Sequence, residues 1–425
     1  MSGELAVWLA GRLAGRLRRD SGRVSFSYGS EYRNAPRAMP LSWSLPLTQE
    51  NHGPETTEPW FDNLLPDNDQ ARARWARGLG LARPTVFDIL ARAGEDCPGA
   101  IQVLEEGRTP AQASGREPLS LKEVGDRIRA LREAGQYGWS PGPEGRWSLG
   151  GAQPKFAVGW SEDVGWYEPT GREPSTHIIK IGFTGKDESD WAEHLTSRVA
   201  AKLGLTVAQT EVVNLGGERA VVVRRFDRLR EPSGRVRRLH QEDCCQALGL
   251  WRHVKYESDG GPGLAAVAQL LSAAVGPRHG EATLRQFAGS VVFSWLAACP
   301  DAHAKNYALL HLGPSPRLAP LFDLASASML WNAAEVEYSA RLAMSLDGEN
   351  RLFALRARHL AAAARDLGVP EDWILAEARR QLNGLGPALD AALAEEDSIP
   401  DATAASFREG LAARVASVER EAGLP

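Results

Sequence analysis

Three oxygen-bearing side chains late in the chain have the types and the spacing that phosphoryl transfer needs. Asp301 is followed five residues later by Asn306, and Asp323 ends an apolar run further along. In a phosphotransferase a carboxylate accepts the proton of the attacking hydroxyl, while an Asn and a second Asp hold Mg²⁺ on the nucleotide phosphates. We therefore expect Asp301 to be a catalytic base, and Asn306 and Asp323 to be metal ligands.

Short apolar segments must position these three residues. Residues 307–312 are predicted to form a strand, and residues 313–316 are a turn rich in Pro and Gly. A long helix over residues 281–299, with large apolar side chains, leads into Asp301.

Groups that could bind a nucleotide phosphate occur earlier in the chain. Gly150 and Gly151 lie between two β-prone segments within residues 146–158, and glycines let backbone N–H groups approach phosphate oxygens. Lys180 interrupts the apolar strand 176–181, and Glu193 lies on the amphipathic helix 188–203, which is the order of the kinase ion pair. Each feature also has a plain structural interpretation: a simple turn, an edge-strand lysine facing solvent, and a solvated helix glutamate.

The remaining pattern predicts an α+β protein that is rich in strands before residue 235 and rich in helices after it. Before residue 235 we expect strands at 5–9, 24–28 and 41–47, a turn marked by Gly11 and Gly15, a packed turn or the start of a short helix at 60–66, a strand after Cys97, a connector at 105–120, a hairpin at 210–226, and helices at 69–78, 85–93 and 121–134. After it we expect helices at 241–249, 264–275, 281–299, 351–367, 371–385 and 406–422.

Length and composition limit the class of protein. A chain of 425 residues is long for one core, so two or three subdomains are expected. The formal net charge of −5 argues against a chain that mainly wraps nucleic acid. The four cysteines have no metal-ligand spacing and are expected to be buried free thiols. Without a run of 18 apolar residues or a signal-peptide pattern, we expect a cytoplasmic protein with no membrane association.

Taken together, the motifs resemble the HipA family of bacterial toxin Ser/Thr kinases, within the wider kinase-like superfamily. The N-terminal segments 45–47 (LPL) and 61–66 (FDNLLP) are similar to that family's N-terminal subdomain. The other motifs that carry the resemblance are residues 148–155 (SLGGAQPK), 176–180 (THIIK), 225–228 (RFDR), 241–246 (QEDCCQ), 255–263 (KYESDGGPG), 301–306 (DAHAKN) and 321–323 (LFD).

The resemblance implies a two-lobed protein-kinase-like fold. Its segments would be a β-rich N-terminal subdomain at 1–104, a kinase N-lobe with the Gly-rich loop and the ATP lysine at 105–235, and an all-α C-lobe with the catalytic and metal-binding loops at 236–425. It also implies an ATP- and Mg²⁺-dependent protein kinase that acts as the toxin of a toxin–antitoxin system.

The resemblance assigns roles to individual residues of this chain. Asp301 would be the catalytic base, and Asn306 and Asp323 the Mg²⁺ ligands. Ser148 would be a serine that the enzyme autophosphorylates, although it could also be a loop serine that only bonds the backbone. The nucleotide-binding positions would be the phosphate-covering loop Leu149, Gly150, Gly151, Ala152 and Gln153, the phosphate lysine Lys180, the hinge Arg224, Arg225 and Phe226, and His303, Ala304, Lys305, Asn306, Phe322 and Asp323.

The resemblance further implies partners. Family members pair with a helix-turn-helix antitoxin (HipB-like), which binds operator DNA, and they phosphorylate translation proteins, notably aminoacyl-tRNA synthetases. This sequence departs from the family pattern at Pro154, Pro300 and Ala302, which could alter loop mobility. The helices after residue 367 show no basic cluster, so direct contact of this chain with DNA is not expected.

Two other functions stay open at this point. A phosphotransferase of the same fold that acts on a small molecule would need the same Asp301 and Asn306 spacing. An inactive ATP-binding protein that serves only as a co-repressor partner is disfavoured by the presence of Lys180, Asp301, Asn306 and Asp323 together.

Overall fold

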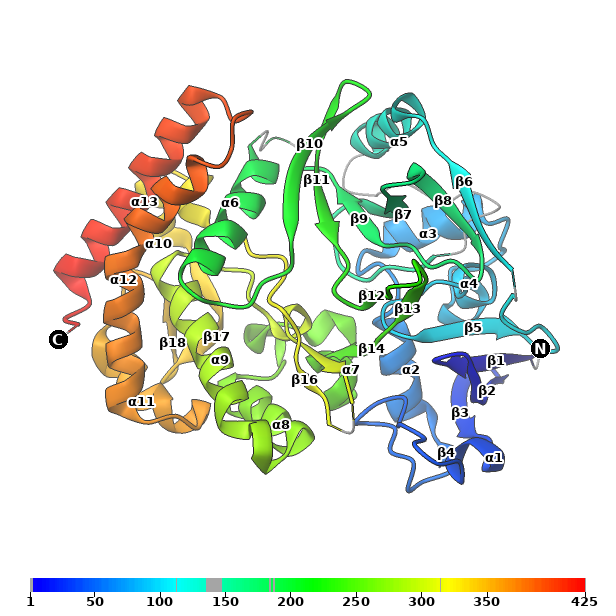
Figure 1. Ribbon diagram of the computed structural model, residues 1–425. Helices are drawn as coiled ribbons and strands as arrows, with labels where there is room; N and C mark the ends of the chain where they lie inside the picture. Colours follow the sequence, from blue (N-terminus) through cyan, green and yellow to red (C-terminus); the bar gives the residue numbers. More distant parts are fainter. Residues whose placement is uncertain are drawn as a thin grey trace. The chain divides into compact units, whose positions relative to one another are not determined.

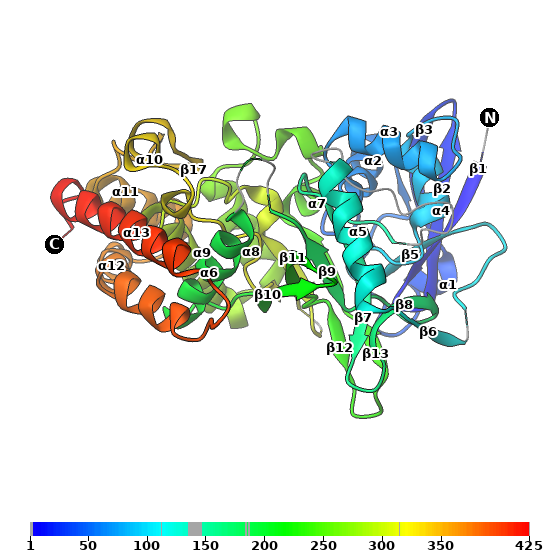
Figure 2. The same ribbon diagram turned by 90° about the horizontal axis from the view of Figure 1, so that it is seen from above.

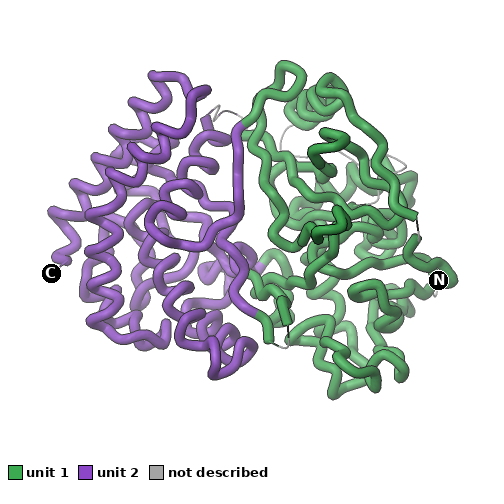
Figure 3. The backbone as a smooth tube through the Cα atoms, viewed as in Figure 1, with its two compact units in different colours: residues 1–184, 213–253, 308–316 green, residues 185–212, 254–307, 317–425 purple. Residues whose placement is uncertain are grey.

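The computed structural model describes residues 3–111, 113–134, 147–182, 185, 188–313 and 315–424. The chain divides into two compact units (Figure 3). Unit 1 consists of residues 1–184, 213–253 and 308–316, and unit 2 of residues 185–212, 254–307 and 317–425. The division at 1–104, 105–235 and 236–425 that the sequence suggests stays a prediction.

Unit 1 begins with a five-stranded antiparallel sheet in the order β4-β3-β2-β1-β5 (Figure 1). Its strands are β1 (Gly3–Leu9), β2 (Arg12–Asp20), β3 (Arg23–Tyr28), β4 (Asn51–His52) and β5 (Ile101–Glu105). Alternate side chains of β3 are buried, as expected for a strand with one face on a core. The predicted strands at 5–9 and 24–28 and the strand after Cys97 are confirmed.

A six-stranded sheet follows in the order β10-β11-β9-β7-β8-β6. Its strands are β6 (Ser114–Pro118), β7 (Lys155–Ser161), β8 (Gly165–Gly171), β9 (His177–Lys180), β10 (Thr210–Leu215) and β11 (Glu218–Arg224). β9 lies in the interior of this sheet, where it pairs with both β7 and β11. The predicted strand at 176–181 and the predicted hairpin at 210–226 are confirmed.

Helices pack on these sheets and complete the core of unit 1. They are α1 (Ser30–Arg33), α2 (Pro54–Asp62), α3 (Asp69–Gly78), α4 (Val86–Ala93), α5 (Leu121–Ala134) and α7 (Cys244–Leu248). The sequence placed α3 and α5 at these bounds, and the Asn68 side chain caps α3 by accepting from the N–H groups of Gln70 and Ala71. One hydrophobic core runs from β1 through Trp75 and Trp147 to Phe156, so the two sheets of unit 1 form one packed body.

The remaining strands of unit 1 are short. β12 (Arg228–Arg230) pairs with β13 (Val236–Arg238), and β14 (His240–Asp243) pairs with β15 (Ala308–His311). β15 confirms the strand predicted directly after Asn306.

Unit 2 is mainly helical, as predicted. Its helices are α6 (Ser189–Lys202), α8 (Leu264–Val275), α9 (Pro277–Leu296), α10 (Ala333–Ser339), α11 (Ala357–Leu367), α12 (Glu371–Leu393) and α13 (Asp401–Glu421). Figure 2 shows α12 and α13 side by side, and α12 also packs on α6, α9 and α11. The central helix α9 is buried along its second half and leads towards Asp301.

Short elements complete unit 2. They are the 3-10 turns η2 (Arg252–Val254, which begins in unit 1), η3 (Glu257–Asp259), η4 (Ala304–Asn306) and η5 (Ala327–Met329), and the strands β16 (Arg317–Leu318), β17 (Arg341–Leu346) and β18 (Glu349–Arg351). β17 and β18 form a two-stranded sheet, which adds strand structure to a region that the sequence describes as all-α.

Gly15 does not mark a turn, contrary to the prediction. It lies inside β2, and the turn between β1 and β2 is at Ala10 and Gly11. A Cβ atom at Gly15 would lie 2.1 Å from the carbonyl oxygen of Ser27 and 2.9 Å from the ring of Phe26. The glycine therefore permits close strand packing and does not reverse the chain.

The predicted strand at 41–47 is also wrong. Side chains, and not a neighbouring strand, satisfy its backbone: the Tyr28 hydroxyl accepts from the Leu41 N–H at 2.6 Å and donates to the Leu45 carbonyl at 2.6 Å. The Trp43 N–H donates to Glu242 Oε1 at 3.0 Å. The alternation of apolar residues here reflects two buried leucines in an irregular segment, which periodicity alone cannot distinguish from a strand.

Other boundaries differ too. α9 begins at Pro277 and ends at Leu296, α12 continues to Leu393, and α13 begins at Asp401. The segment 105–120 contains the edge strand β6, and residues 241–243 belong to β14, so that Asp243 caps α7 and does not lie inside the helix. α11 begins at Ala357 because residues 349–351 pair with β17. Trp60 and Phe61 lie at the end of α2, whereas the sequence predicted a packed turn or the start of a helix there. The sequence also has a stretch rich in Gly and Pro at 138–145, which lies outside the described residues.

All four cysteines are buried and free, as predicted. In the part of the chain that the structure describes, no helix is both long and apolar enough to cross a lipid bilayer.

Candidate active site

The predicted catalytic loop of unit 2 is a tight turn at the end of α9. The Asp301 carbonyl accepts from the His303 N–H at 2.8 Å and from Asn306 Nδ2 at 2.6 Å. The His303 carbonyl in turn accepts from the Asn306 N–H at 2.9 Å, within η4. The structure therefore brings Asp301 and Asn306 together. The spacing of five residues is the length of one turn that the Asn306 side chain closes.

This turn exposes one acid and buries its other polar side chains. The Asp301 side chain is 55% exposed, whereas His303, Lys305 and Asn306 are buried. His303 Nε2 lies 3.9 Å from Asp301 Oδ1. A proton acceptor for an incoming hydroxyl needs an exposed carboxylate held by a rigid backbone, which is the arrangement seen here.

Tyr256 holds the Asp301 side chain from a second segment of unit 2. Its hydroxyl donates a short hydrogen bond to Asp301 Oδ1, and its ring packs edge-on against His303 with a centroid distance of 4.9 Å. The neighbouring Lys255 carbonyl accepts from the Ala304 N–H at 3.3 Å. The motif at 255–263 therefore supports the catalytic loop, a role that its sequence did not reveal.

Asp323 lies in an extended segment that pairs with the residues after α6. Leu321 forms a parallel bridge with Val207, with its N–H donating to the Thr206 carbonyl at 2.9 Å and its carbonyl accepting from Ala208 at 2.8 Å. Directly after this anchor, Asp323 has a φ of +56°, a left-handed conformation that is unfavourable for a residue with a Cβ atom. A conformation of this kind persists only where its surroundings enforce it, and such positions cluster at functional sites.

The donor set of unit 2 suits Mg²⁺ bound to a nucleotide. Asn306 uses its amide nitrogen to bind the Asp301 carbonyl, so a metal ligand from this side chain would have to be its amide oxygen. Asp323 adds a carboxylate, and Mg²⁺ in nucleotide sites takes one or two such oxygens besides phosphate and water. Among the described residues no group of three or more His, Cys, Asp or Glu side chains is placed to hold a metal.

Lys180 of unit 1 does not lie on the solvated face of an edge strand. It is 3% exposed on the interior strand β9, opposite Lys155 of β7 and Val221 of β11. The interpretation as a solvated edge-strand lysine is therefore wrong, and the phosphate-binding role stays a prediction. Glu193, on α6 of unit 2, is likewise buried and not simply solvated.

Ser148 begins the predicted phosphate loop in a fully buried position. Its hydroxyl donates to Cys97 Sγ at 3.2 Å, and its N–H donates to the Asp96 carbonyl at 3.1 Å. Burial raises the pKa of Cys97 to about 12, so the thiol is neutral. Trp147 pairs with Asp96, and its ring packs edge-on against Trp75 at a centroid distance of 5.3 Å.

The rest of the loop is held by the segment before α3 and by residues that follow the loop. Gly151 bridges to Pro66 and has a φ of +98°. Lys155 Nζ donates to the Gly150 carbonyl at 2.9 Å, and a Cβ atom at Gly151 would lie 2.7 Å from that same Nζ. Gln153 Nε2 donates to the Ile181 carbonyl at 2.8 Å, which links the loop to the end of β9. A small pocket lies beneath the loop, with both apolar and polar lining from Trp75, Trp147, Leu149, Ala152, Gln153 and Lys155.

The predicted hinge follows β11. Arg224 is exposed at the end of the strand, and Phe226 is half-buried. Arg225 differs from both, because its side chain is buried in ion pairs, its N–H donates to the Thr176 carbonyl at 3.0 Å and its carbonyl accepts from Arg228 at 3.3 Å. Arg225 is thus a structural anchor of the hinge.

Comparison with known proteins decides the family. Residues 5–104 match the model of the HipA N-terminal domain, and residues 147–385 match that of the HipA-like C-terminal domain. The chain belongs to the HipA family. It is 34% identical over 373 residues to the putative kinase Y4mE of Sinorhizobium fredii, covering 86% of each chain. It is 29% identical over 388 residues to the Ser/Thr-protein kinase toxin HipA of Shewanella oneidensis, covering 88% of this chain and 86% of that protein.

A solved structure shows the same fold. HipA of Shewanella oneidensis, in its complex with HipB and operator DNA, matches 98% of this chain with a TM-score of 0.83 and 25% sequence identity, and 97% of that chain is covered. The fold class expected for a HipA kinase, mixed α and β with a β-rich first part, is confirmed.

Sequence reasoning missed two residues of this site. Tyr256 binds Asp301 from 45 positions away, and Asp96 binds the loop at Ser148 from 52 positions away. Neither lies in a spacing that predicts the contact, since both contacts depend on how distant segments fold together.

Proposed function

We propose that this protein is an ATP- and Mg²⁺-dependent Ser/Thr protein kinase and the toxin of a toxin–antitoxin system. The observation that carries the proposal is the turn in which Asn306 Nδ2 binds the Asp301 carbonyl at 2.6 Å while the Tyr256 hydroxyl binds the Asp301 carboxylate. This arrangement supports Asp301 as the proton acceptor and Asn306 as a metal ligand.

The groups of unit 2 would carry out the chemistry. The Asp301 carboxylate would accept the proton of a substrate hydroxyl. The hydroxyl oxygen would form a bond to the γ-phosphorus of ATP while the bond from that phosphorus to the ADP oxygen breaks. Tyr256 would orient the carboxylate, and Asn306 and Asp323 would hold the metal. Bound ATP would supply the phosphoryl group, with Mg²⁺ neutralising charge on its phosphates.

The groups of unit 1 would bind the nucleotide. Lys180 would neutralise the α- and β-phosphates, and the backbone N–H groups of Leu149–Gln153 would cover them. The hinge at Arg224–Phe226 would meet the adenine through its backbone. Burial of Lys180 supports this assignment, because a strand lysine without such a role is normally exposed.

Ser148 is proposed as the autophosphorylation site. In the present conformation its hydroxyl is buried against Cys97, so transfer to it requires that the loop leaves this position. A phosphate on Ser148 would place roughly two negative charges next to the Asp96 carbonyl. The phosphorylated side chain could therefore not return to its buried position against Cys97.

The partners are proposed from the relatives. Because the matching HipA structure contains HipB and operator DNA, we propose a HipB-like helix-turn-helix antitoxin for this chain, with operator DNA reached through it. The substrate is proposed to be a translation protein such as an aminoacyl-tRNA synthetase.

The destination of the γ-phosphate tests this function. The purified chain is incubated with γ-labelled ATP, Mg²⁺ and a bacterial lysate, and label is followed in proteins, in small molecules and in the Ser148 peptide by mass spectrometry. We expect labelled protein and a phosphorylated Ser148 peptide, with no label when EDTA removes the metal.

Two outcomes would argue for the alternatives. Label only in small molecules would indicate a small-molecule phosphotransferase. Nucleotide binding with no transfer in any fraction would indicate an inactive ATP-binding partner of the antitoxin.

A further inference from the structure

Asp96 lies between α4 and β5, far in sequence from the proposed nucleotide-binding residues of unit 1. Its backbone nevertheless holds the start of the phosphate loop. The Asp96 carbonyl accepts from the Ser148 N–H at 3.1 Å, and residue 96 forms a parallel bridge with Trp147. The position of the Asp96 backbone therefore sets where the loop begins.

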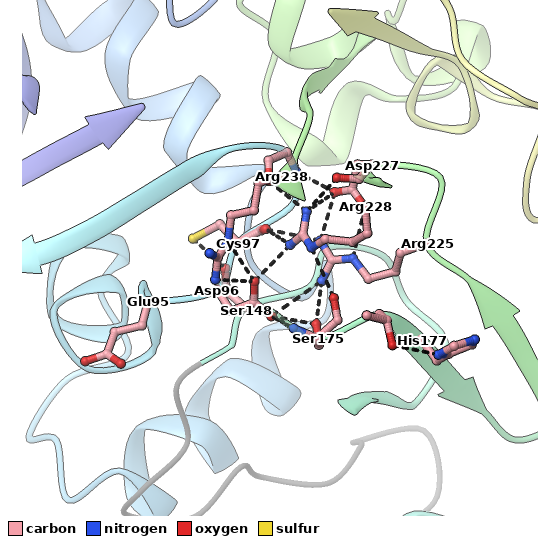
Figure 4. A network of polar contacts seen from close by, with 12 residues as sticks. Glu95, Asp96, Cys97, Ser148, Ser175, His177, Arg225, Asp227, Arg228 and Arg238 are labelled. Atoms are coloured by element: carbon pink, nitrogen blue, oxygen red, sulfur yellow. Dashed lines mark hydrogen bonds and ion pairs between the residues drawn. The ribbon is translucent and has the colours of Figure 1, made fainter. Parts of the chain in front are cut away.

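The Asp96 side chain is fixed by a buried network (Figure 4). Its Oδ2 accepts from the Ser175 N–H at 2.9 Å and from the Ser175 hydroxyl at 2.5 Å. Its Oδ1 lies 2.9 Å from Arg228 Nη2 and 3.2 Å from Arg238 Nη2. The carboxylate thus binds Ser175, two residues before β9, and two arginines that follow the hinge.

A second acid completes the network. Asp227 Oδ2 lies 2.9 Å from Arg225 Nη2 and 2.9 Å from Arg228 Nη1, and it accepts from the Gly99 N–H at 2.6 Å. Residues 96–99 therefore contact the hinge segment 225–228 through both acids. Nearly all of these side chains are shielded from water, so their geometry is tightly determined.

Asp96 stays ionised in this position. Burial alone would raise the pKa of the carboxyl, but the guanidinium groups of Arg228, Arg238 and Arg225 and the bond from Ser175 together hold it well below its usual range. A charged carboxylate among three arginines and one further acid cannot move without leaving buried charges unpaired.

We propose that Asp96 is a positioning residue that couples the hinge segment to the phosphate loop, so that Arg228 and Arg238 keep the loop closed over the nucleotide. Ion pairs and the Ser175 bonds fix the side chain, the side chain fixes the backbone of residue 96, and that backbone holds Trp147 and Ser148. This inference rests on the proposed function for its effect on ATP, but its effect on the loop can be measured without nucleotide.

Arg238→Gln is the first test variant. Arg238 lies at the edge of the network with a side chain 11% exposed. Its loss therefore removes one ion pair to Asp96 and leaves the more deeply buried ion pairs in place. Asp96→Asn is the stronger variant, and it is combined with Arg238→Gln so that one positive charge leaves with the negative one. The control is Glu173→Gln, which removes another buried carboxylate of unit 1 that binds Arg116 at 2.8 Å and Tyr167 at 3.1 Å.

The measurements are hydrogen exchange at residues 147–155 in the nucleotide-free full chain, and the KM for ATP and kcat of the same samples. For Arg238→Gln we expect faster exchange at the Ser148 amide and a KM raised about tenfold with kcat little changed. The control should leave both exchange at 147–155 and KM as in the wild type.

Each outcome decides the inference. Unchanged exchange at 147–155 in folded Arg238→Gln and in the double variant would overturn it, as would equal acceleration in Glu173→Gln. If the wild-type chain neither binds nor turns over ATP, the proposed kinase function fails, while the exchange measurement still decides whether Asp96 couples the hinge to the loop.

Discussion

Asp323 has a left-handed backbone conformation that we connect with its proposed function. Its φ of +56° places it in the left-handed region, which residues with a Cβ atom adopt less readily than glycine, and the bridge between Leu321 and Val207 fixes the chain just before it. A glycine would relieve the strain at this position, yet the chain keeps a carboxylate. We attribute this to its proposed role as a metal ligand.

Asp323→Gly should therefore separate stability from activity. We expect the free energy of unfolding to stay the same or to rise by about 1 kcal/mol, because glycine adopts the left-handed region without a steric penalty. Phosphoryl transfer should fall by about a hundredfold or more, because a charge-neutralising ligand is lost. Urea unfolding and label transfer from ATP measure the two effects.

Asp347→Gly provides the matched control. Asp347 also has a positive φ, +51°, but it lies in the turn between β17 and β18. Its substitution should change stability in the same direction and leave phosphoryl transfer at the wild-type level. Full activity in Asp323→Gly, or an equal loss of activity in Asp347→Gly, would refute the assignment of Asp323.

At the scale of elements, α9 leads into the proposed catalytic loop, and α13 holds the end of α9. The buried Arg414 of α13 donates from Nη2 to the Trp295 carbonyl at 2.7 Å and from Nε to the Leu296 carbonyl at 3.3 Å. These are carbonyls of the last turn of a helix, which have no partner within it. Burial lowers the pKa of Arg414 to about 10, so the guanidinium is still charged at neutral pH and suits the negative end of α9.

Arg414→Met should loosen the end of α9 while keeping side-chain length. We expect the free energy of unfolding to fall by about 2 kcal/mol, because buried carbonyls lose their donors. The kcat should fall as well, since Asp301 follows directly after this helix end. Arg408→Met on the same helix removes an exposed arginine that pairs with Asp390, and it should cost at most about 0.5 kcal/mol.

A drop in stability that is equal in Arg408→Met and Arg414→Met would contradict this account of α13. So would an Arg414→Met variant with wild-type stability and kcat.

The sequence predicted elements well where one local signal dominates. α5, α8 and α3 match their predicted bounds because apolar periodicity and end signals agree there. The sequence-based prediction was wrong where tertiary contacts determine the secondary structure. β6 is a polar edge strand recognisable only by its pairing with β8, and the alternating segment 41–47 is irregular because Tyr28 and Glu242 bind its backbone.

At the scale of the whole molecule, the sequence located the chemical groups but not what holds them. Asp301 and Asn306 were recognisable because their contact is local, within one turn. The supports from Tyr256 and Asp96 come from distant segments, so that only the folded chain reveals them. The burial of Lys180 likewise depends on β9 being an interior strand, which a single strand's sequence does not specify.

Each unit carries part of the proposed machinery. Unit 1 holds the phosphate loop, Lys180 and the hinge, and unit 2 holds Asp301, Asn306 and Asp323. The HipA family models cover both, from residue 5 to residue 385 with one interval. The full chain is therefore the right sample for the decisive measurement.

That measurement is phosphoryl transfer and nucleotide affinity in Asp301→Asn, with Asp390→Asn on the exposed face of α12 as control. We predict that Asp301→Asn binds ATP–Mg²⁺ as the wild type does but transfers phosphate about a thousandfold more slowly, because the loss of a general base removes proton transfer and no proposed metal ligand. Asp390→Asn should be fully active. Transfer at the wild-type rate by folded Asp301→Asn would contradict the account.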